Sequence, residues 1–272
     1  DDNGKPLAAN ERHDYKYVGG QDTWTALKSG KLAWKLIEKK SDFESLTSGT
    51  TPAKVVGAAQ VGSTLQEKRC RAMTDAPYDH ITKNPSAEQL ARQPLADPKN
   101  PNVPSLATMA RAAINCLDDN PKGFYLMIEG GAVDWANHAN EPDRMIEEQI
   151  DFVQAIEAVV AWVESHGGWD NTLLILTADH ESGLLWGPHS DKIAFAPLQD
   201  RGAGKLPGLR YNSHGHANSL VPVYARGPGS QRFAELVRGN DEKAAAQWGI
   251  SGQYINNTDI FKVMRAEVDA GK

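Results

Sequence analysis

The strongest constraint on the fold of this chain is one long apolar stripe that stands between two short apolar runs. From Met145 to Val163, apolar residues recur at the spacing of an amphipathic helix that covers a core. The runs at 124–128 and 172–177 are short, nearly all apolar and closed by polar residues, which is typical of buried strands. Strand, helix and strand in this order predict parallel pairing through a right-handed crossover. We therefore expect an α/β fold, with a largely parallel central sheet flanked by helices.

Local signals add detail to this pattern. A helix is expected over 105–117 from its apolar spacing. Asn140 is expected to cap the long helix, with Pro142 in its first turn, and the glycines at 167–168 are expected to end it. A further strand is predicted at 221–225, where the proline inside the run favours an edge position or an irregular start.

Two segments interrupt the alternation of helices and strands. Five prolines between residues 85 and 104 exclude a helix or an interior strand, so an irregular crossing of the surface is expected there. A loop-rich excursion is expected at about 187–213, and its length favours a functional or oligomer-contact role. The chain contains no internal repeat, and we expect residues 1–272 to form a single α/β domain.

Composition excludes several classes of protein. With 40% hydrophobic residues the chain is too apolar to be disordered, and no run approaches the roughly 20 apolar residues of a membrane span. A net charge of −6 without runs of like charge argues against nucleic acid or a membrane surface as a partner. Two cysteines, Cys70 and Cys116, are too few for a disulfide scaffold, and their spacing leaves a disulfide and two buried thiols equally open.

Carboxylates and an imidazole follow the first expected strand. Glu129 comes directly after the apolar run, and Asp134 and His138 follow it four residues apart. One helical turn would place Asp134 and His138 on the same face. Taken alone, such a pair is more often a structural hydrogen bond or a cap than a metal site.

Similar groups lie next to the other two strands. Asp179 and His180 follow the second strand, where a sharp turn of the backbone would let both reach one target. His214 and His216 precede the third strand and would point to the same side of an extended segment. Because three separate segments supply carboxylate or imidazole, which suit a divalent metal such as zinc, the combination favours a metal site.

Several motifs resemble the alkaline phosphatase family. The segment 124–131, with the aspartate and histidine that follow it, resembles the family's segment for magnesium and zinc ligands. The segment 176–183 resembles its second-zinc segment, and His216, eleven residues before a Gly-Pro pair, resembles its last ligand segment. The spacing to that pair favours His216 over His214 as a ligand. The resemblance extends from about residue 15 to about residue 265, with its motifs in the family's order.

The resemblance implies an alkaline-phosphatase-like fold with two Zn²⁺ sites and one Mg²⁺ site. One zinc, which activates the attacking water, would have its full set of protein ligands in this chain. The second zinc, which steadies the nucleophile, would have two ligands here, and magnesium would have one. The implied ligands are Asp134, His138 and His216 for the first zinc, Asp179 and His180 for the second, and Glu129 for magnesium.

The family's nucleophile stands in an Asp-Ser-Ala or Asp-Thr-Ala element, and this sequence has none. Residues 74–76 read Thr-Asp-Ala, in the wrong order, and Asp22-Thr23 is followed by Trp24. We also find no counterpart of the aspartate that bridges magnesium and the second zinc, or of the arginine that clamps the phosphate. The chain is therefore expected to correspond to the C-terminal portion of a phosphatase, to hold no catalytic nucleophile, and to be inactive without the N-terminal part.

The resemblance further implies a phosphate monoester substrate, a homodimer, and a periplasmic or secreted location. The N-terminal part is expected either to be a separate fragment or to be simply not included. Two alternatives stay open: a phosphodiesterase or phosphate mutase of the same superfamily, and a non-catalytic metal-binding module. Trp135 stands where relatives often carry a polar residue near the phosphate, which bears on the range of substrates.

Overall fold

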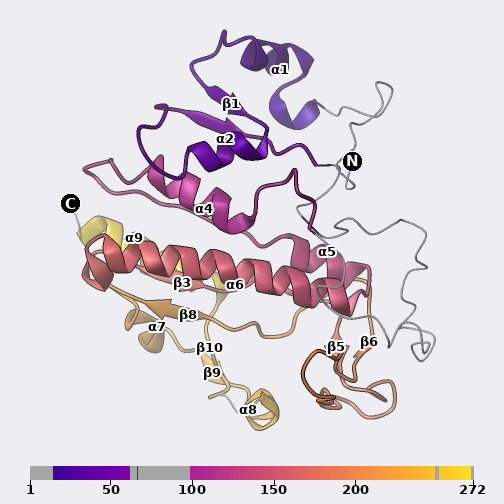
Figure 1. The fold of residues 1–272 in the computed structure, drawn as a ribbon. Helices are drawn as coiled ribbons and strands as arrows, with labels where there is room; N and C mark the ends of the chain where they lie inside the picture. Colours follow the sequence, from indigo (N-terminus) through magenta and orange to yellow (C-terminus); the bar gives the residue numbers. More distant parts are fainter. Residues whose placement is uncertain (1–14, 62–65, 67–98, 249–250, 271–272) are drawn as a thin grey trace. The chain divides into compact units, whose positions relative to one another are not determined.

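The computed structural model describes residues 15–61, 66, 99–248 and 251–270 (Figure 1). These residues belong to two compact units. Unit 1 comprises the residues up to Val159 together with Arg201–Pro207, and unit 2 comprises Val160–Asp200 and the residues from Gly208 onward. The expectation of a single domain stays a prediction. The segment 85–98, Cys70 and the Thr-Asp-Ala sequence at 74–76 lie outside the described residues.

Unit 1 begins with a small parallel strand pair and the helix that connects its strands. Strands β1 and β2 pair in parallel, with Leu36 opposite Val56. The side chain of Phe43 is buried against Gly57, where a Cβ atom would lie only 2.7 Å from the ring, so glycine allows this close packing. The elements are η1 (Lys16–Val18), α1 (Gln21–Lys28), β1 (Lys35–Ile37), α2 (Lys40–Ser45) and β2 (Val55–Gly57).

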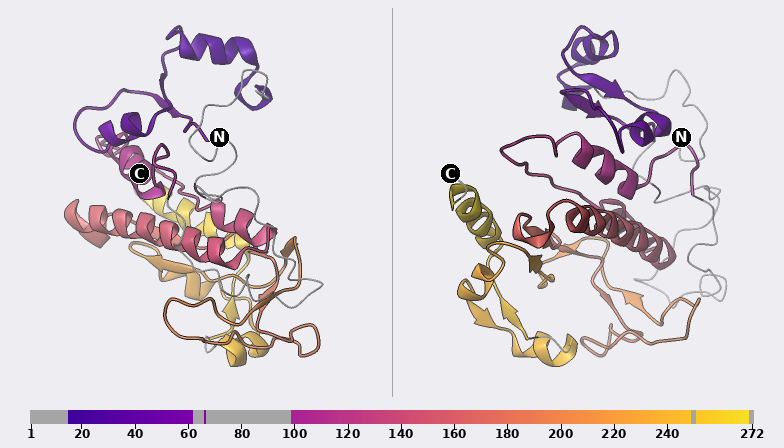
Figure 2. Two further views of the ribbon diagram at one scale, coloured as in Figure 1. Left: turned by 45° about the vertical axis from the view of Figure 1, so that its right-hand side comes forward. Right: turned by 60° about the vertical axis from the view of Figure 1, so that its left-hand side comes forward.

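Helix α4 (Leu106–Asn115) confirms the helix predicted over 105–117. Ser105 is its N-cap, because its Oγ accepts a hydrogen bond from the backbone N–H of Thr108 at 3.1 Å. Figures 1 and 2 show α4 beside α2. A small apolar core joins the two helices and β1 and consists of Ile37, Phe43, Leu46 and Ala112.

The long helix is confirmed as α6 (Pro142–Ser165), but it does not begin as predicted. Asn140 is not its cap: the residue is fully buried with a φ of +56°, in the left-handed region. A shorter helix, α5 (Ala132–His138), precedes it, and the backbone N–H of Glu141 donates to the carbonyl of Ala136 at 2.9 Å. This tight turn between two helices needs a left-handed residue, and asparagine tolerates that conformation better than most. Pro142 stands at the first helical position, as expected.

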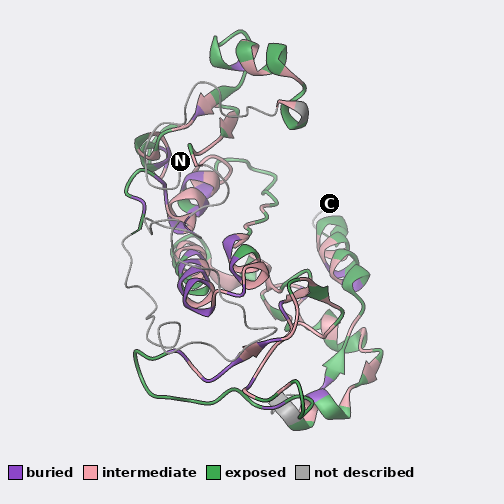
Figure 3. Cartoon of the chain, turned by 90° about the vertical axis from the view of Figure 1, so that its right-hand side faces the viewer, coloured by how far each residue is buried: buried purple, intermediate pink, exposed green. Residues whose placement is uncertain are grey.

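Figure 3 colours each residue of the chain by its burial, and the buried residues of α6 include more charged side chains than its apolar stripe predicts. Ile150 and Val153 are 37% and 42% exposed, whereas Arg144 and Asp151 are buried. Arg144 Nη1 lies 2.7 Å from Glu147 Oε2, and the Lys99 ammonium lies 2.6 Å from an oxygen of Asp151. Buried charges are tolerated when they are paired in this way, so the ion pairs allow this face to be covered.

The strand predicted at 124–128 is not formed in the described structure. Tyr125 and Met127 are 72% and 71% exposed, and no described strand pairs with this segment. A strand is defined by the ladder of hydrogen bonds to its neighbour, which an apolar run cannot supply by itself. In the same region, Asn100 and Val103 are buried, so 99–104 is irregular as expected but is not all on the surface.

Unit 2 contains both of the other predicted strands. They are β3 (Leu174–Leu176) and β8 (Tyr224–Arg226), and they pair in antiparallel fashion with Ile175 opposite Ala225. The largely parallel central sheet is not confirmed, since β1–β2 is the only parallel pair among the described strands. The other antiparallel pairs are β4 (Glu181–Ser182) with β7 (His216–Ala217), β5 (Leu185–Trp186) with β6 (Arg210–Tyr211), and β9 (Gly239–Asn240) with β10 (Gln253–Tyr254).

The rest of unit 2 consists of helices and of the loop between β5 and β6, except for Arg201–Pro207, which belong to unit 1. Gly167, with a φ of +96°, follows the end of α6 as predicted. The buried carboxylate of Asp259 accepts hydrogen bonds from Arg238 and Lys262 and fixes the start of the last helix. None of the described helices combines the length and the hydropathy that a membrane crossing requires. The helices are η2 (Gly168–Asp170), α7 (Arg232–Glu235), α8 (Glu242–Trp248) and α9 (Asn257–Ala270).

Candidate metal centre

In unit 1, helix α5 brings two of the predicted ligands together. Asp134 and His138 lie on consecutive turns, and Asp134 Oδ2 is 3.2 Å from His138 Nε2. Both side chains are partly exposed, at 33% and 40%. Just before the helix, Gly130 packs so closely on Phe152 of α6 that a Cβ atom there would lie 2.7 Å from the ring. The helix is therefore fixed close to α6, and the prediction that the two side chains share a face is confirmed.

Glu129, the residue predicted to bind magnesium, lies in the same unit at the entrance to α5. It is exposed, and its carboxylate folds back over Gly131, with Oε1 only 3.2 Å from where a Cβ atom of residue 131 would stand. The glycine leaves room for this arrangement. Its role as a ligand stays a prediction.

In unit 2, the second predicted pair lies at the start of β4. Asp179 Oδ2 is 3.2 Å from His180 Nε2, and the other ring nitrogen of His180 lies 3.3 Å from the backbone carbonyl oxygen of Glu181. A histidine that donates one N–H to a carbonyl presents its other nitrogen as an acceptor, which is the usual arrangement of a metal-binding imidazole. The backbone of β4 thus orients His180 toward Asp179.

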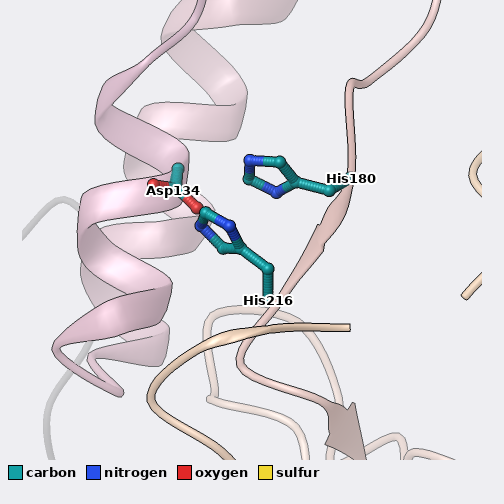
Figure 4. Close-up of side chains that lie close together, drawn as sticks. All are labelled: Asp134, His180 and His216. Carbon is teal, nitrogen blue, oxygen red and sulfur yellow. The ribbon is translucent and has the colours of Figure 1, made fainter. Parts of the chain in front are cut away.

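His216 joins this pair through the ladder between β4 and β7. Ser182 stands opposite His216, so the two side chains are on one face, and His180 lies two residues before Ser182. The rings of His180 and His216 are stacked, with their centroids 3.5 Å apart and their planes at 22° (Figure 4). The turn that permits this pairing includes Gly183, whose φ is +89° and whose N–H donates to the carbonyl of Gly215 at 2.9 Å.

The distances within each Asp–His pair fit a shared divalent ion. Two ligand atoms that each bind zinc tetrahedrally at about 2.0–2.1 Å lie about 3.3 Å from each other. The oxygen–nitrogen distance is 3.2 Å in both pairs, one on α5 and one at β4. The same distance also suits an ordinary carboxylate–imidazole contact, so each pair has the ligand spacing of a zinc site. Figure 4 shows Asp134 on its helix, His180 just before β4 and His216 in β7.

Sequence reasoning missed two polar residues next to these ligands. Within the described structure, Glu181 Oε2 and Ser182 Oγ are buried and have no hydrogen-bond partner. Burying a polar atom without a hydrogen-bond partner lowers the stability of the fold by on the order of 1–3 kcal/mol, so these two atoms require an explanation. The signal was present in the sequence, since both residues directly follow the Asp179–His180 pair.

Comparison with known proteins decides the family. The family model described as alkaline phosphatase matches residues 12–202, which is more than half of the chain. The chain belongs to the alkaline phosphatase family. It is 41% identical over 153 residues to alkaline phosphatase H of Pseudomonas aeruginosa, covering 54% of this chain and 32% of that protein. It is 30% identical over 174 residues to the alkaline phosphatase of Escherichia fergusonii, covering 62% of this chain and 32% of the relative.

Solved structures support an alkaline-phosphatase-like fold. The crystal structure of a cold-active alkaline phosphatase from Shewanella sp. matches with a TM-score of 0.50 and 20% identity. The match covers 80% of this chain and 59% of the Shewanella chain. The Thermus thermophilus alkaline phosphatase matches 91% of this chain and 63% of its own with a TM-score of 0.50 and 14% identity. The chain thus spans about a third of these two curated relatives and about three fifths of the two structural ones.

Proposed function

We propose that this chain contributes the metal ligands of a metal-dependent phosphomonoester hydrolase. The observation that carries the proposal is the pair of Asp–His contacts of 3.2 Å, on α5 and at β4, in segments that stand in the family's order. Membership of the alkaline phosphatase family supports the reaction type. In this proposal the substrate is a phosphate monoester.

The proposed division of ligands follows the family resemblance. Bound zinc ions would activate a water molecule and neutralise the charge on the entering and leaving oxygens of phosphoryl transfer. The chain's own residues position the proposed ligands. The Glu181 carbonyl sets which ring nitrogen His180 presents, and α5 fixes Asp134 beside His138. The proposed ligands are Asp134, His138 and His216 for one zinc, Asp179 and His180 for the second, and Glu129 for magnesium.

The chain has no Asp-Ser-Ala or Asp-Thr-Ala element, so in this proposal the nucleophile comes from an N-terminal portion. We propose that this chain alone does not turn over. A homodimer and a periplasmic or secreted location are likewise proposals that rest on the family. Trp135, which is 50% exposed next to Asp134, would offer an apolar contact where relatives often place a polar one.

Metal analysis and hydrolysis assays test the proposal. The 272-residue chain should bind about one zinc ion tightly and leave p-nitrophenyl phosphate intact. The full-length gene product should hydrolyse this ester at alkaline pH and lose activity with a chelator. Rapid hydrolysis of the bis ester alone would favour a phosphodiesterase. Metal binding without turnover by the full-length product would favour a non-catalytic module, and turnover by the isolated chain would overturn our account of the nucleophile.

A further inference from the structure

The face of helix α5 that carries the two candidate ligands also carries an indole. Ala132 and Ala136, four residues apart, are buried and mark the packed face of the helix. A helix turns by about 100° per residue, so Asp134 lies on the opposite face, with His138 about 40° and Trp135 about 100° from it in the same direction. The indole therefore stands on the same side of α5 as the two ligands, one turn before the histidine.

Trp135 is also the one exposed residue of α5. Half of its surface, 50%, is accessible, whereas the other residues of the helix are buried or half-buried. Within the described part of the chain, the indole N–H donates no hydrogen bond and the ring stacks on no other ring. A single exposed apolar side chain is common on protein surfaces and is not a site by itself. Its place beside two candidate metal ligands gives this indole a possible substrate.

The proposed function, on which this step rests, identifies the part of the substrate that would lie there. In that proposal, Asp134 and His138 belong to the site that activates water, and the nucleophile belongs to the other site. The nucleophile forms its bond to phosphorus as the bond to the alcohol oxygen breaks, and water later displaces the nucleophile. Because both displacements are in line, water enters on the side from which the alcohol has left. The alcohol group is therefore expected beside Asp134 and His138, within reach of Trp135.

We propose that Trp135 binds the organic group of the substrate, so that the protein prefers phosphate monoesters of aromatic alcohols. An indole and an aromatic ring attract each other in offset-stacked or edge-to-face arrangements, which adds to the gain from burying apolar surface. A short alkyl alcohol would gain little from this contact. The phosphate group is common to all monoesters, so the preference is set by Trp135 and not by the metal ligands.

Calorimetric titration of the zinc-loaded full-length gene product with two phosphonates tests the proposal without turnover. Methylphosphonate and benzylphosphonate carry the same anionic group, have carbon in place of the ester oxygen, and differ by an aromatic ring. We expect benzylphosphonate to bind about tenfold more tightly, because the ring gains apolar burial and an aromatic contact. Trp135→Ala should reduce the ratio of the two affinities to about one to two, and Trp135→Phe should retain most of it.

Trp34→Ala is the matched control. Trp34 is 45% exposed in the same unit but lies outside α5, just before β1, so its loss should leave the ratio of affinities unchanged. Trp135→Ala should still bind methylphosphonate as the wild type does, which shows that the variant folds and keeps its metal centre.

The outcomes separate the role of Trp135 from the proposed function. Equal affinities of the wild-type protein for both phosphonates would overturn the role of Trp135 and leave the proposed function standing. A preference for benzylphosphonate that survives in Trp135→Ala would do the same. A wild-type protein that binds neither phosphonate would contradict the proposed function, and the role of Trp135 with it.

Discussion

The Asp134–His138 pair on α5 and the His180–His216 pair of unit 2 form by different routes. On α5, Asp134 and His138 meet because one helical turn separates them, so the sequence spacing nearly determines the contact. In unit 2, His180 meets His216 only because β4 and β7 pair across a long loop. The helical pair is therefore set by local structure, and the strand pair by topology. Substitutions in the β4–β7 ladder or in its turn should therefore disturb the His180–His216 pair and leave the Asp134–His138 pair intact.

The largest effect is expected from the histidines near β7. His216→Ala should weaken zinc binding by about 100-fold or more, since loss of even an outer-sphere partner of a ligand costs 10–100-fold. His214→Ala, two residues away and exposed, should change the affinity by less than a few-fold. Competition titration with a chromophoric chelator measures both. If His214→Ala cost as much as His216→Ala, the assignment of the last ligand would be wrong.

A smaller effect is expected from the turn that closes the ladder. Gly183→Ala places a side chain at a φ of +89°, which should lower the free energy of unfolding by about 1–2 kcal/mol. Because this turn sets the register of Ser182 and His216, zinc affinity should also fall by about tenfold. Thermal unfolding and zinc titration of the same samples provide the two readouts.

Gly168→Ala is the matched control for that variant. It has a φ of +71° in the same unit and open space around the Cβ position, so it should destabilise the chain similarly without changing zinc affinity. An equal loss of zinc binding in both variants would show that the metal site responds to stability in general and not to the β4–β7 ladder.

Among these variants, Asp259→Asn is expected to have the smallest effect on zinc affinity. Hydrogen bonds from Arg238 and Lys262 hold the pKa of this carboxyl well below its ordinary value of 3.8. The unfolded chain therefore binds the proton more readily, and the stabilisation is present above about pH 3.8 and lost as the pH falls toward the folded-state pKa. Asp259→Asn should lower the stability at neutral pH, and its difference from the wild type should shrink in acid.

Urea denaturation at several pH values measures this difference. Asp269→Asn is the matched control, because Asp269 forms an exposed pair with Arg265 at 2.6 Å and such pairs contribute little. Zinc affinity at neutral pH should be unchanged in both variants. A pH-independent difference between Asp259→Asn and the wild type would contradict the assignment of the stabilisation to the ionised carboxylate.

Local chemistry explains which parts of the fold could be predicted. Helix α4 was predictable because its apolar spacing lies within a few turns, and the contact of Asp134 with His138 needed only helical periodicity. The run at 124–128 was misassigned because a strand depends on a partner far away in the sequence. The charged buried face of α6 was missed for a similar reason, since Asp151 is paired by Lys99.

The candidate ligands were predictable as residue types but not as a set. Their positions after apolar runs pointed to Glu129, Asp134 and Asp179, yet nothing local showed that His180 stacks on His216. Glu181 could not be placed on the opposite face until the register of β4 and β7 was known. Register is a tertiary property, because a slip of one residue would exchange the two faces.

The closed base of the loop between β5 and β6 has a practical consequence. Gln199 and Gly208 exchange backbone hydrogen bonds at 3.0 and 2.8 Å, and the exposed stretch between them contains Gly202 and Gly204, both with positive φ. A loop whose two ends are already tied together can accept extra residues at its tip with little entropic penalty. An epitope tag or a fluorescent reporter inserted there should leave His180 and His216, the proposed zinc ligands, in register.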